Sequence, residues 1–578
     1  MNIPWRARIL LGPMRPFLVK KVLDALRERV LVRRLRAQLP TRVHEGRSLH
    51  VGLTPLPSAQ WFVAHSTEVI TFARAMRAGR VDAYGITTWS VGGSDPTDVD
   101  IRSVHELSRM HHWCAYALAA HIDRNHRDDW CEALFDEIST FMHETPAEVG
   151  VHWQFPMGTG IRLHSMLVAW DWARRSGWIH AIGDHHVAAY AVDHARSVVA
   201  RRESRGGLST SHYAANLLGI LAAGAYLIGE PTADDWRKLA VTELCKELHR
   251  QILPDGMANE GSTGYHRQVT DLFVQAASFG VFSSHELSKI ALAVDRCRTL
   301  ERLGMPLIGD NDDGLAMKLT GLAPHLDYMY DVGDRLCGVE QQSGADLVAP
   351  DLGLTIRQHG SFVTSLRNGQ VGQFGKGGHA HNDQNSMTLT IGGEPFVVDP
   401  GTSCYTSDPQ RRDRERSVHD HATMWPPSSE QAFIPPGEDG LFWLLDDELE
   451  TEVVANTETV WHGIVESQNG GRHERHVTLH PDQLSVRDVY TGTAENNETA
   501  EWVLPLGEGI EIELDAGRAV LRGRSVSALL VWDNGTVVAE KMIIAPGFAR
   551  ACSTLCLRIR TNALTWTLSR YQIANFAE

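Results

Sequence analysis

The sequence predicts an α+β multidomain protein, in which a domain of antiparallel helical hairpins is followed by an antiparallel β-sandwich. Its 578 residues exceed what one hydrophobic core holds. Apolar residues recur with a helical period up to about residue 305 and alternate in short runs after about residue 347. We therefore expect an N-terminal basic helical segment over 1–50, a helical domain over 51–345 and a β domain over 346–578.

The N-terminal segment is basic and amphipathic. Arg6, Arg8, Arg15, Lys20 and Lys21 interrupt its apolar residues, so no secretion signal is evident. No later stretch approaches the roughly 20 apolar residues of a membrane span. We expect a cytoplasmic protein, with the periplasm or secretion by a non-standard route as alternatives. The segment could attach to an anionic membrane surface or to a partner. It could equally be an ordinary first helix with its charges in solvent, and we favour this second interpretation.

Residues 212–230 show the helical pattern most clearly. Leu217, Leu221 and Leu227 fall on one stripe, and Gly229 and Pro231 then end the helix. A capping box at Ser283–Glu286 starts another helix. Similar stretches lie near 57–78, 103–122, 128–143, 159–176, 184–202, 233–251 and 266–281. Consecutive hairpins of this kind indicate an α/α toroid or a solenoid, and no clear repeat distinguishes the two.

The C-terminal part reads as strands. Alternating runs cover 353–367, 386–398, 475–489 and 528–540, with Gly-Gly, Pro-Asp and Asn-Gly turns between or within them. The polar stretch 338–350 is the expected linker. Strands without intervening helices favour an antiparallel sandwich.

Charge and composition exclude some functions. The net charge is −16, which makes recognition of nucleic acid by a basic face improbable. The eight cysteines form no CxxC pair and suit buried reduced thiols better than a disulfide framework. The 29 histidines and 16 tryptophans would suit a groove for a polar ligand.

A histidine-rich cluster at 377–383 is the most specific local signal. His379 and His381 alternate, so in an extended segment both side chains point to one side. Asp399 and His421 follow at the end of the next strand and beyond it. Two imidazoles and a carboxylate form a common zinc-binding set. Spacing alone equally allows polar loop residues satisfied by hydrogen bonds.

Four motifs in order resemble the heparinase II/III-like polysaccharide lyases. They are NEGSTGYH at 259–266, GHAHND at 378–383, VVDPGT at 397–402 and the R-S-x-x-x-H-x-T element at 416–423. By motif the resemblance extends from Trp153 to His421. It implies an N-terminal α/α toroid, an incomplete barrel of helical hairpins, and a C-terminal antiparallel β-sandwich.

The resemblance also implies β-elimination at a uronic acid. A base removes the C5 proton, an acid protonates the departing O4, and a third group neutralises the carboxylate so that the C5 proton becomes acidic enough. Tyr265 matches the family's catalytic tyrosine, and His379 matches a second acid/base or neutralising group. His381, Asp399 and His421 match ligands of a structural metal, for which we expect Zn²⁺, with Mn²⁺ or Ca²⁺ as alternatives.

The remaining site residues follow from the same comparison. His212 is expected to be catalytic, although Ser211 before it replaces the usual asparagine. Glu260 is expected to bond His212 or the sugar. Further substrate contacts are expected from Trp153, Gln154, Arg162, Arg414 and Arg416.

Two other functions compete with a lyase acting on an anionic polysaccharide or oligosaccharide. One is a glycoside hydrolase that uses Glu260 with Asp310 or Asp312. The other is a non-catalytic protein that binds or assembles polysaccharide. The sequence does not distinguish a monomer from a homodimer. For the acidic run at 309–314 we expect hydrogen bonding at a turn and domain junction rather than calcium binding.

Overall fold

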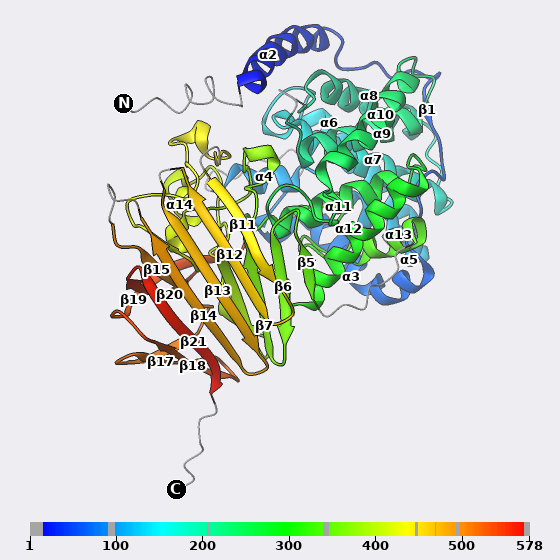
Figure 1. The fold of residues 1–578 in the computed structure, drawn as a ribbon. Coiled ribbons are helices and arrows are strands. Elements are labelled where there is room, and N and C mark those ends of the chain that lie inside the picture. Colours follow the sequence, from blue (N-terminus) through cyan, green and yellow to red (C-terminus); the bar gives the residue numbers. More distant parts are fainter. Residues whose placement is uncertain are drawn as a thin grey trace. The chain divides into compact units, whose positions relative to one another are not determined.

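The structure is a computed structural model that describes residues 15–90, 99–204, 208–338, 346–445, 449–468, 470–492 and 498–571 (Figure 1). Residues 1–14 of the predicted N-terminal segment and 339–345 of the predicted linker lie outside this description. The chain forms two compact units. The first comprises Met1–Ile252, Arg267–Val294 and Asp313–Glu340, and the second comprises Leu253–His266, Asp295–Asp312 and Gln341–Glu578. The second unit thus includes two segments from the range predicted as helical.

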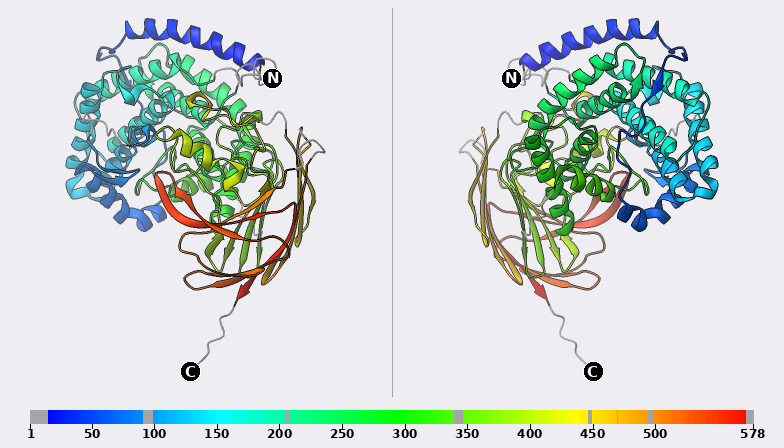
Figure 2. Two further views of the ribbon diagram at one scale, coloured as in Figure 1. Left: turned by 90° about the vertical axis from the view of Figure 1, so that its left-hand side faces the viewer. Right: turned by 90° about the vertical axis from the view of Figure 1, so that its right-hand side faces the viewer.

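The first unit is built from helices packed in chain order, in blue to green in Figure 2. α3 packs on α5, α5 on α6 and α7, α7 on α8 and α9, and α9 on α10. The helices are α2 (Arg15–Arg36), α3 (Ala59–Arg77), α4 (Ile101–Leu107), α5 (His112–Ile122), α6 (Arg127–Glu144), α7 (Pro156–Arg175), α8 (Gly183–Ala200), α9 (Ser211–Tyr226), α10 (Ala233–Gln251), α11 (Thr263–Ala277), α12 (Ser284–Arg302) and α13 (Asp327–Cys337). α11 and α12 each contribute residues to both units. The predicted helical domain is confirmed.

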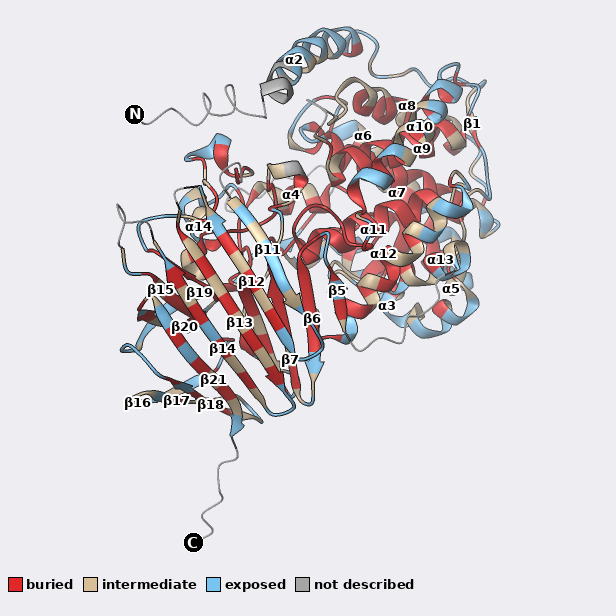
Figure 3. Cartoon of the chain, in the orientation of Figure 1, coloured by how far each residue is buried: buried red, intermediate tan, exposed pale blue. Residues whose placement is uncertain are grey.

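The centre of this unit is the pair α7 and α9, which is largely buried (Figure 3). The two helices touch at Gly160 and Gly219. A Cβ atom added at Gly219 would lie 2.5 Å from the backbone oxygen of Gly160, so only glycine permits this approach. The tight contact removes a long apolar surface of both helices from water.

The sequence located most helices, with one error. The capping box forms as predicted, because Glu286 Oε2 accepts from the Ser283 amide at 2.7 Å and Ser283 Oγ accepts from the Glu286 amide at 3.4 Å. The single helix predicted over 103–122 is wrong. Met110, with φ of 55°, adopts a left-handed conformation that separates α4 from α5.

The second unit contains three antiparallel sheets. One has the order β11-β12-β13-β14-β21-β18-β17-β16, another β5-β6-β7-β8-β9 and the third β10-β15-β20-β19. The strands of the largest sheet are β11 (Leu449–Asn456), β12 (Val460–Ser467), β13 (Arg472–His480), β14 (Gln483–Thr491), β16 (Glu511–Asp515), β17 (Arg518–Arg522), β18 (Ser527–Trp532) and β21 (Ala563–Tyr571). The others are β5 (Leu347–Ala349), β6 (Leu354–His359), β7 (Phe362–Arg367), β8 (Ser386–Ile391), β9 (Glu394–Val397), β10 (Met424–Trp425), β15 (Glu501–Pro505), β19 (Val538–Gly547) and β20 (Arg550–Arg560).

Residues from all three sheets share one hydrophobic core. It includes Leu389 of β8, Val477 of β13, Trp502 of β15 and Trp566 of β21, each at most 2% exposed. Between β9 and β10 the chain forms the short helix α14 (Pro409–Glu415) and a turn of 3₁₀ helix at Val418–Asp420. The predicted antiparallel β domain is confirmed, and it carries the segments 377–383 and 399–421 that hold most of the candidate site.

Candidate active site

Tyr265 and His379 form a stacked pair in the second unit. Their ring centroids are 3.5 Å apart and their planes differ by 14°. Tyr265 lies in the first turn of α11, where Ser262 Oγ accepts from its backbone amide at 3.1 Å. His379 lies in the loop before β8. The two rings are only 3% and 6% exposed, so two of the three predicted catalytic side chains occupy one small, largely dry space.

The phenol of Tyr265 is hydrogen-bonded to a carboxylate and a second phenol. It donates to Asp312 Oδ2 at 2.8 Å, and Tyr405 Oη lies 3.1 Å away. Burial, together with Asp310, Tyr265 and Asp312, raises the pKa of Tyr405 well above its usual range, so Tyr405 stays protonated. Asp312 is therefore the group placed to accept the proton of Tyr265.

Asp310 joins His379 to the predicted metal ligands. His379 Nδ1 lies 2.8 Å from Asp310 Oδ2, and His381 Nε2 lies 2.9 Å from Asp310 Oδ1. Arg412 contacts both carboxylate oxygens, and Thr402 donates to one of them at 2.8 Å. Burial alone would raise the pKa of Asp310, but Arg412 and the two histidines hold it well below its usual range.

The two histidines point to one side, as predicted, since both reach the same carboxylate. With Nδ1 donating to Asp310, His379 directs Nε2 toward Glu260, whose Oε2 lies 3.5 Å away. Glu260 is fully buried against this ring. The expected contact of Glu260 with His212 or the sugar remains a prediction.

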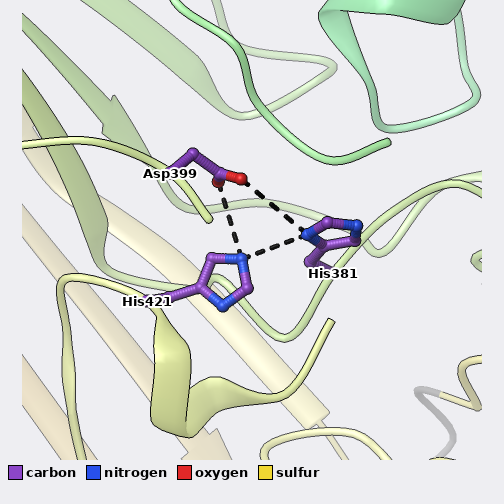
Figure 4. A group of neighbouring side chains, drawn as sticks. All are labelled: His381, Asp399 and His421. Carbon is purple, nitrogen blue, oxygen red and sulfur yellow. Dashed lines mark hydrogen bonds and ion pairs between the residues drawn. The ribbon is translucent and has the colours of Figure 1, made fainter. Parts of the chain in front are cut away.

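His381, Asp399 and His421 form a group that suits a cation (Figure 4). His381 Nδ1 and His421 Nε2 are 3.1 Å apart. Asp399 Oδ1 lies 3.9 Å from His381 Nδ1, and Oδ2 lies 3.5 Å from His421 Nε2. Figure 4 shows the three donor groups turned toward one another from three separate segments.

The hydrogen-bond partners of this group leave lone pairs facing inward. His421 Nδ1 bonds to the Ser417 carbonyl at 2.7 Å and so carries the proton, which leaves Nε2 bare. His381 Nε2 bonds to Asp310, which leaves Nδ1 bare. Within the part of the chain that the structure describes, the buried Asp399 Oδ2 has no hydrogen-bond donor. Two facing lone pairs and a buried carboxylate repel one another unless a cation lies between them, so these residues fit the predicted metal.

His462, Glu474 and His476 form a second, half-buried group on β12 and β13. Both histidine Nε2 atoms lie near Glu474 Oε1, at 2.8 and 3.0 Å. The two imidazoles stack at 3.7 Å with planes 21° apart, and the space between their Nε2 atoms is already occupied by the Glu474 oxygen. Arg472 also holds Glu474 at 2.6 Å. This geometry fits a metal less well than the group around Asp399.

His212, the third predicted catalytic residue, lies in the first unit at the start of α9. Its Nδ1 is 2.8 Å from Glu203 Oε1. Asn216 clamps Glu203 by donating to Oε2 at 3.0 Å and accepting from its amide at 2.8 Å. Burial disfavours ionisation of Glu203, but His212 and Asn216 lower its pKa below the ordinary value. Whether His212 acts with Tyr265 and His379 stays a prediction.

The burial of Trp153 and Arg162 does not support their expected contacts with substrate. Arg162 is fully buried and donates to the backbone oxygens of Ser108 and His152, at 2.9 and 3.1 Å. Its guanidinium also lies 5.1 Å from the ring of Trp153, whose Nε1 donates to the Thr145 oxygen. Burial lowers the pKa of Arg162 to about 9. Both side chains belong to the interior of the first unit, because the arginine satisfies carbonyls left at the ends of neighbouring segments.

The other expected contacts divide similarly. Gln154 is exposed and Ser211 is buried at the start of α9. Arg414 is exposed, whereas Arg416 is buried and bonds to Asp413 and the backbone oxygen of Trp443. Substrate binding by Gln154, Ser211 and Arg414 remains a prediction, and the burial of Arg416 does not support it.

Sequence reasoning did not assign Asp312 and Tyr405 to the lyase site, assigned Asp310 to a turn, and placed Arg412 in a basic run, as a groove or solvated-loop residue, without a partner. In the sequence, Asp310 and Asp312 lie in the acid-rich run at 309–314. Tyr405 is an aromatic residue four positions after the Pro-Gly of the third motif, and Arg412 lies in the basic run at 411–416. None of these signals gives a partner, because the partners lie 47 to 140 residues apart in sequence.

The fold is a domain of paired helices followed by antiparallel sheets, and it carries a tyrosine and a histidine that stack beside buried carboxylates. The model described as Heparinase II/III N-terminus matches residues 87–287, and that described as Heparinase II/III-like, C-terminal, matches 342–567. The chain belongs to the heparinase II/III-like family. No curated protein matches its sequence.

Solved structures share the fold at low identity. A crystal structure of heparinase III is 12% identical and covers 95% of this chain and 90% of its own, with a TM-score of 0.67. The heparan sulfate lyase HepC from Pedobacter heparinus is 14% identical and covers 99% of this chain and 91% of its own, with a TM-score of 0.54. At these identities the likeness establishes the fold alone.

Proposed function

We propose that the protein is a lyase that cleaves a uronic-acid-containing polysaccharide by β-elimination. The observation that carries the proposal is the stacked pair of Tyr265 and His379, anchored by Asp312 and Asp310. Membership of the family supports the same reaction. Glycosaminoglycans, alginate-like polymers and bacterial exopolysaccharides are the candidate substrates.

In the proposed reaction the C5–H and C4–O4 bonds break and a C4=C5 double bond forms. Tyr265 takes the C5 proton while Asp312 receives the phenolic proton, which avoids a phenolate beside a carboxylate. The departing O4 takes a proton from Tyr265 or His379, so the proton lost from C5 is balanced by the proton that O4 gains. His212, braced by Glu203, would act as a further acid/base or would neutralise the uronate.

The metal would serve as a brace. His381, Asp399 and His421 would hold it, and it would supply charge that fixes the loop presenting His379. No proton transfer is assigned to it.

The state of Asp310 argues against the form of the hydrolase alternative in which Asp310 is the acid. Both of its oxygens accept hydrogen bonds, and its pKa is held well below the usual range, so it is a poor general acid at neutral pH. A hydrolase needs one carboxyl group that keeps its proton.

An ultraviolet absorbance assay over a panel of uronic-acid polymers, heparan sulfate and alginate included, tests the proposal. Only elimination creates the conjugated double bond, so at least one polymer should give rising absorbance. Tyr265→Phe should lower the rate by at least about 100-fold, because it removes the transferring hydroxyl. The matched control Tyr571→Phe, at an exposed position on β21, should leave the rate unchanged.

New reducing ends without absorbance would instead identify a hydrolase. Polymer binding with no product of either kind across the panel would support the non-catalytic alternative.

A further inference from the structure

The helix α2 carries a row of exposed apolar side chains. Val22, Leu23, Leu26 and Val30 are 60, 54, 54 and 52% exposed. At 3.6 residues per turn these four positions fall within a sector of about 100°. Figure 3 shows the helix largely in the exposed colour. A continuous apolar stripe of this kind costs free energy in water.

The stripe lies on the side of α2 that faces away from the rest of its unit. α2 packs on α8 through the opposite side. There Leu35 is 5% exposed, Val32 is half-buried, and Glu28 Oε1 lies 3.9 Å from Arg201 Nε at the end of α8. An ordinary amphipathic helix turns its apolar face inward. α2 has a second apolar face that the described residues of its unit do not cover, which the sequence interpretation favouring an ordinary helix did not anticipate.

Basic side chains flank this stripe on both sides. On the helical wheel, Arg29 lies just outside one edge, Arg27 and Arg34 lie outside the other, and Arg33 falls within the sector one turn beyond Val30. All four are exposed. The helix holds eight basic and two acidic residues in a chain whose net charge is −16, so its charge is opposite to that of the protein as a whole. The two acidic residues, Asp24 and Glu28, are half-buried.

We propose that α2 binds the surface of a bilayer that contains anionic phospholipid. The stripe would enter the boundary between headgroups and acyl chains, and the flanking arginines would extend to the phosphates. Charge complementarity selects this occupant, because a neutral apolar partner would leave the arginines without counter-charges. Among the described residues no helix is long and apolar enough to cross a membrane, so the attachment is peripheral.

Co-sedimentation of the full chain with lipid vesicles tests the proposal. Vesicles of phosphatidylcholine with phosphatidylglycerol should bind the protein at least tenfold more tightly than phosphatidylcholine alone, and added salt should weaken the binding. The double variant Val22→Asp/Leu26→Asp should lose at least tenfold in affinity, and Arg29→Gln/Arg33→Gln should lose the preference for phosphatidylglycerol. The matched control Val63→Asp, at an 88% exposed position on α3, should bind as the unaltered chain does.

Thermal unfolding separates lost binding from lost folding. Val22 and Leu26 are exposed, so their replacement should leave the melting temperature within the range of the Val63→Asp control. Failure of the unaltered chain to bind either vesicle would overturn the proposal, as would equal binding by Val22→Asp/Leu26→Asp. Light scattering provides a further test. If the unaltered chain is a dimer that does not bind vesicles, and the double variant is a monomer, a second copy of the chain covers the stripe and the proposal is overturned.

Discussion

Glu203 controls the orientation of His212. Its carboxylate accepts from Nδ1, so in the proposed reaction Nε2 would be the nitrogen that exchanges a proton. Asn216 is fully buried and holds both the carboxylate and the backbone of Glu203, so the imidazole is positioned through a rigid second contact. Glu203 is thus a positioning residue, and its effect on the reaction is separable from that of His212.

Replacement of Glu203 by glutamine should lower kcat/KM by about tenfold or more. It should also shift the limb of the pH–rate profile that reports His212 to lower pH, because the amide no longer stabilises the imidazolium. Glu203→Asp should restore part of the rate, and Glu243→Gln, on α10 beside Tyr213, serves as the control. An unchanged profile in Glu203→Gln would contradict this role.

The sequence predicted which residues form the candidate site, but it predicted only some of the contacts between them. Motifs grouped Tyr265, His379, His381, Asp399 and His421 as site residues, and the structure brings the first two and the last three together. The partners of Tyr265 were not predictable, because Asp312 and Tyr405 reach it through long-range packing. Arg162 is buried against backbone oxygens, and a sequence does not reveal whether an arginine faces substrate or carbonyls in the interior.

At the scale of elements, the largest sheet contains a buried ionic group between β13 and β14. Asp488 accepts from Arg475 Nε at 2.6 Å and from His473 Nε2 at 2.9 Å, and Trp566 Nε1 donates to its other oxygen at 3.0 Å. All these side chains are nearly or fully buried. Burial opposes the charge of Asp488, but Arg475 and His473 hold its pKa well below the ordinary range.

Asp488→Asn should therefore destabilise the protein by about 3 kcal/mol at neutral pH, because it leaves Arg475 buried without a counter-charge. A depressed native pKa means that the contribution of the carboxylate is complete above about pH 4 and is lost as the pH falls below that value. Urea unfolding of both proteins at neutral and acidic pH measures this. The control is Asp515→Asn, which removes an exposed ion pair with Arg518. It should change the free energy of unfolding by less than about 0.5 kcal/mol.

The sequence predicted which segments form helices and which form strands, but it did not predict the break between α4 and α5. The period of apolar residues predicted α9 and the hairpin strands, and Pro481-Asp482 turns β13 into β14 through the direct pairing of His480 with Gln483. The break at Met110 carries no glycine or proline signal, because the left-handed conformation falls on a methionine.

At the scale of the whole molecule, three segments that the sequence separates by up to 40 residues meet at the predicted metal group. Asp399 follows β9, His381 precedes β8, and His421 follows the turn at Val418–Asp420. A cation bound there would join the three segments and would stabilise the folded chain, since it would bind only in the folded state.

Purified protein should contain about one equivalent of divalent metal by mass spectrometry. Asp399→Asn should reduce the content at least about tenfold at equal free metal, whereas Glu474→Gln, in the group of stacked histidines, should not. A chelator should lower the melting temperature of the unaltered chain and leave that of Asp399→Asn unchanged. Retention of metal in Asp399→Asn would contradict the assignment.

The sequence by itself determined the two kinds of domain and the motif residues, because apolar periodicity and local spacing are properties of neighbouring residues. Tertiary structure alone decided that Asp310 is shared by His379, His381 and Arg412, that Arg162 is an interior cation, and that the apolar stripe of α2 stays exposed. These outcomes depend on which distant segments exclude water from a side chain and supply its hydrogen-bond partners, and those segments meet only when the chain has folded.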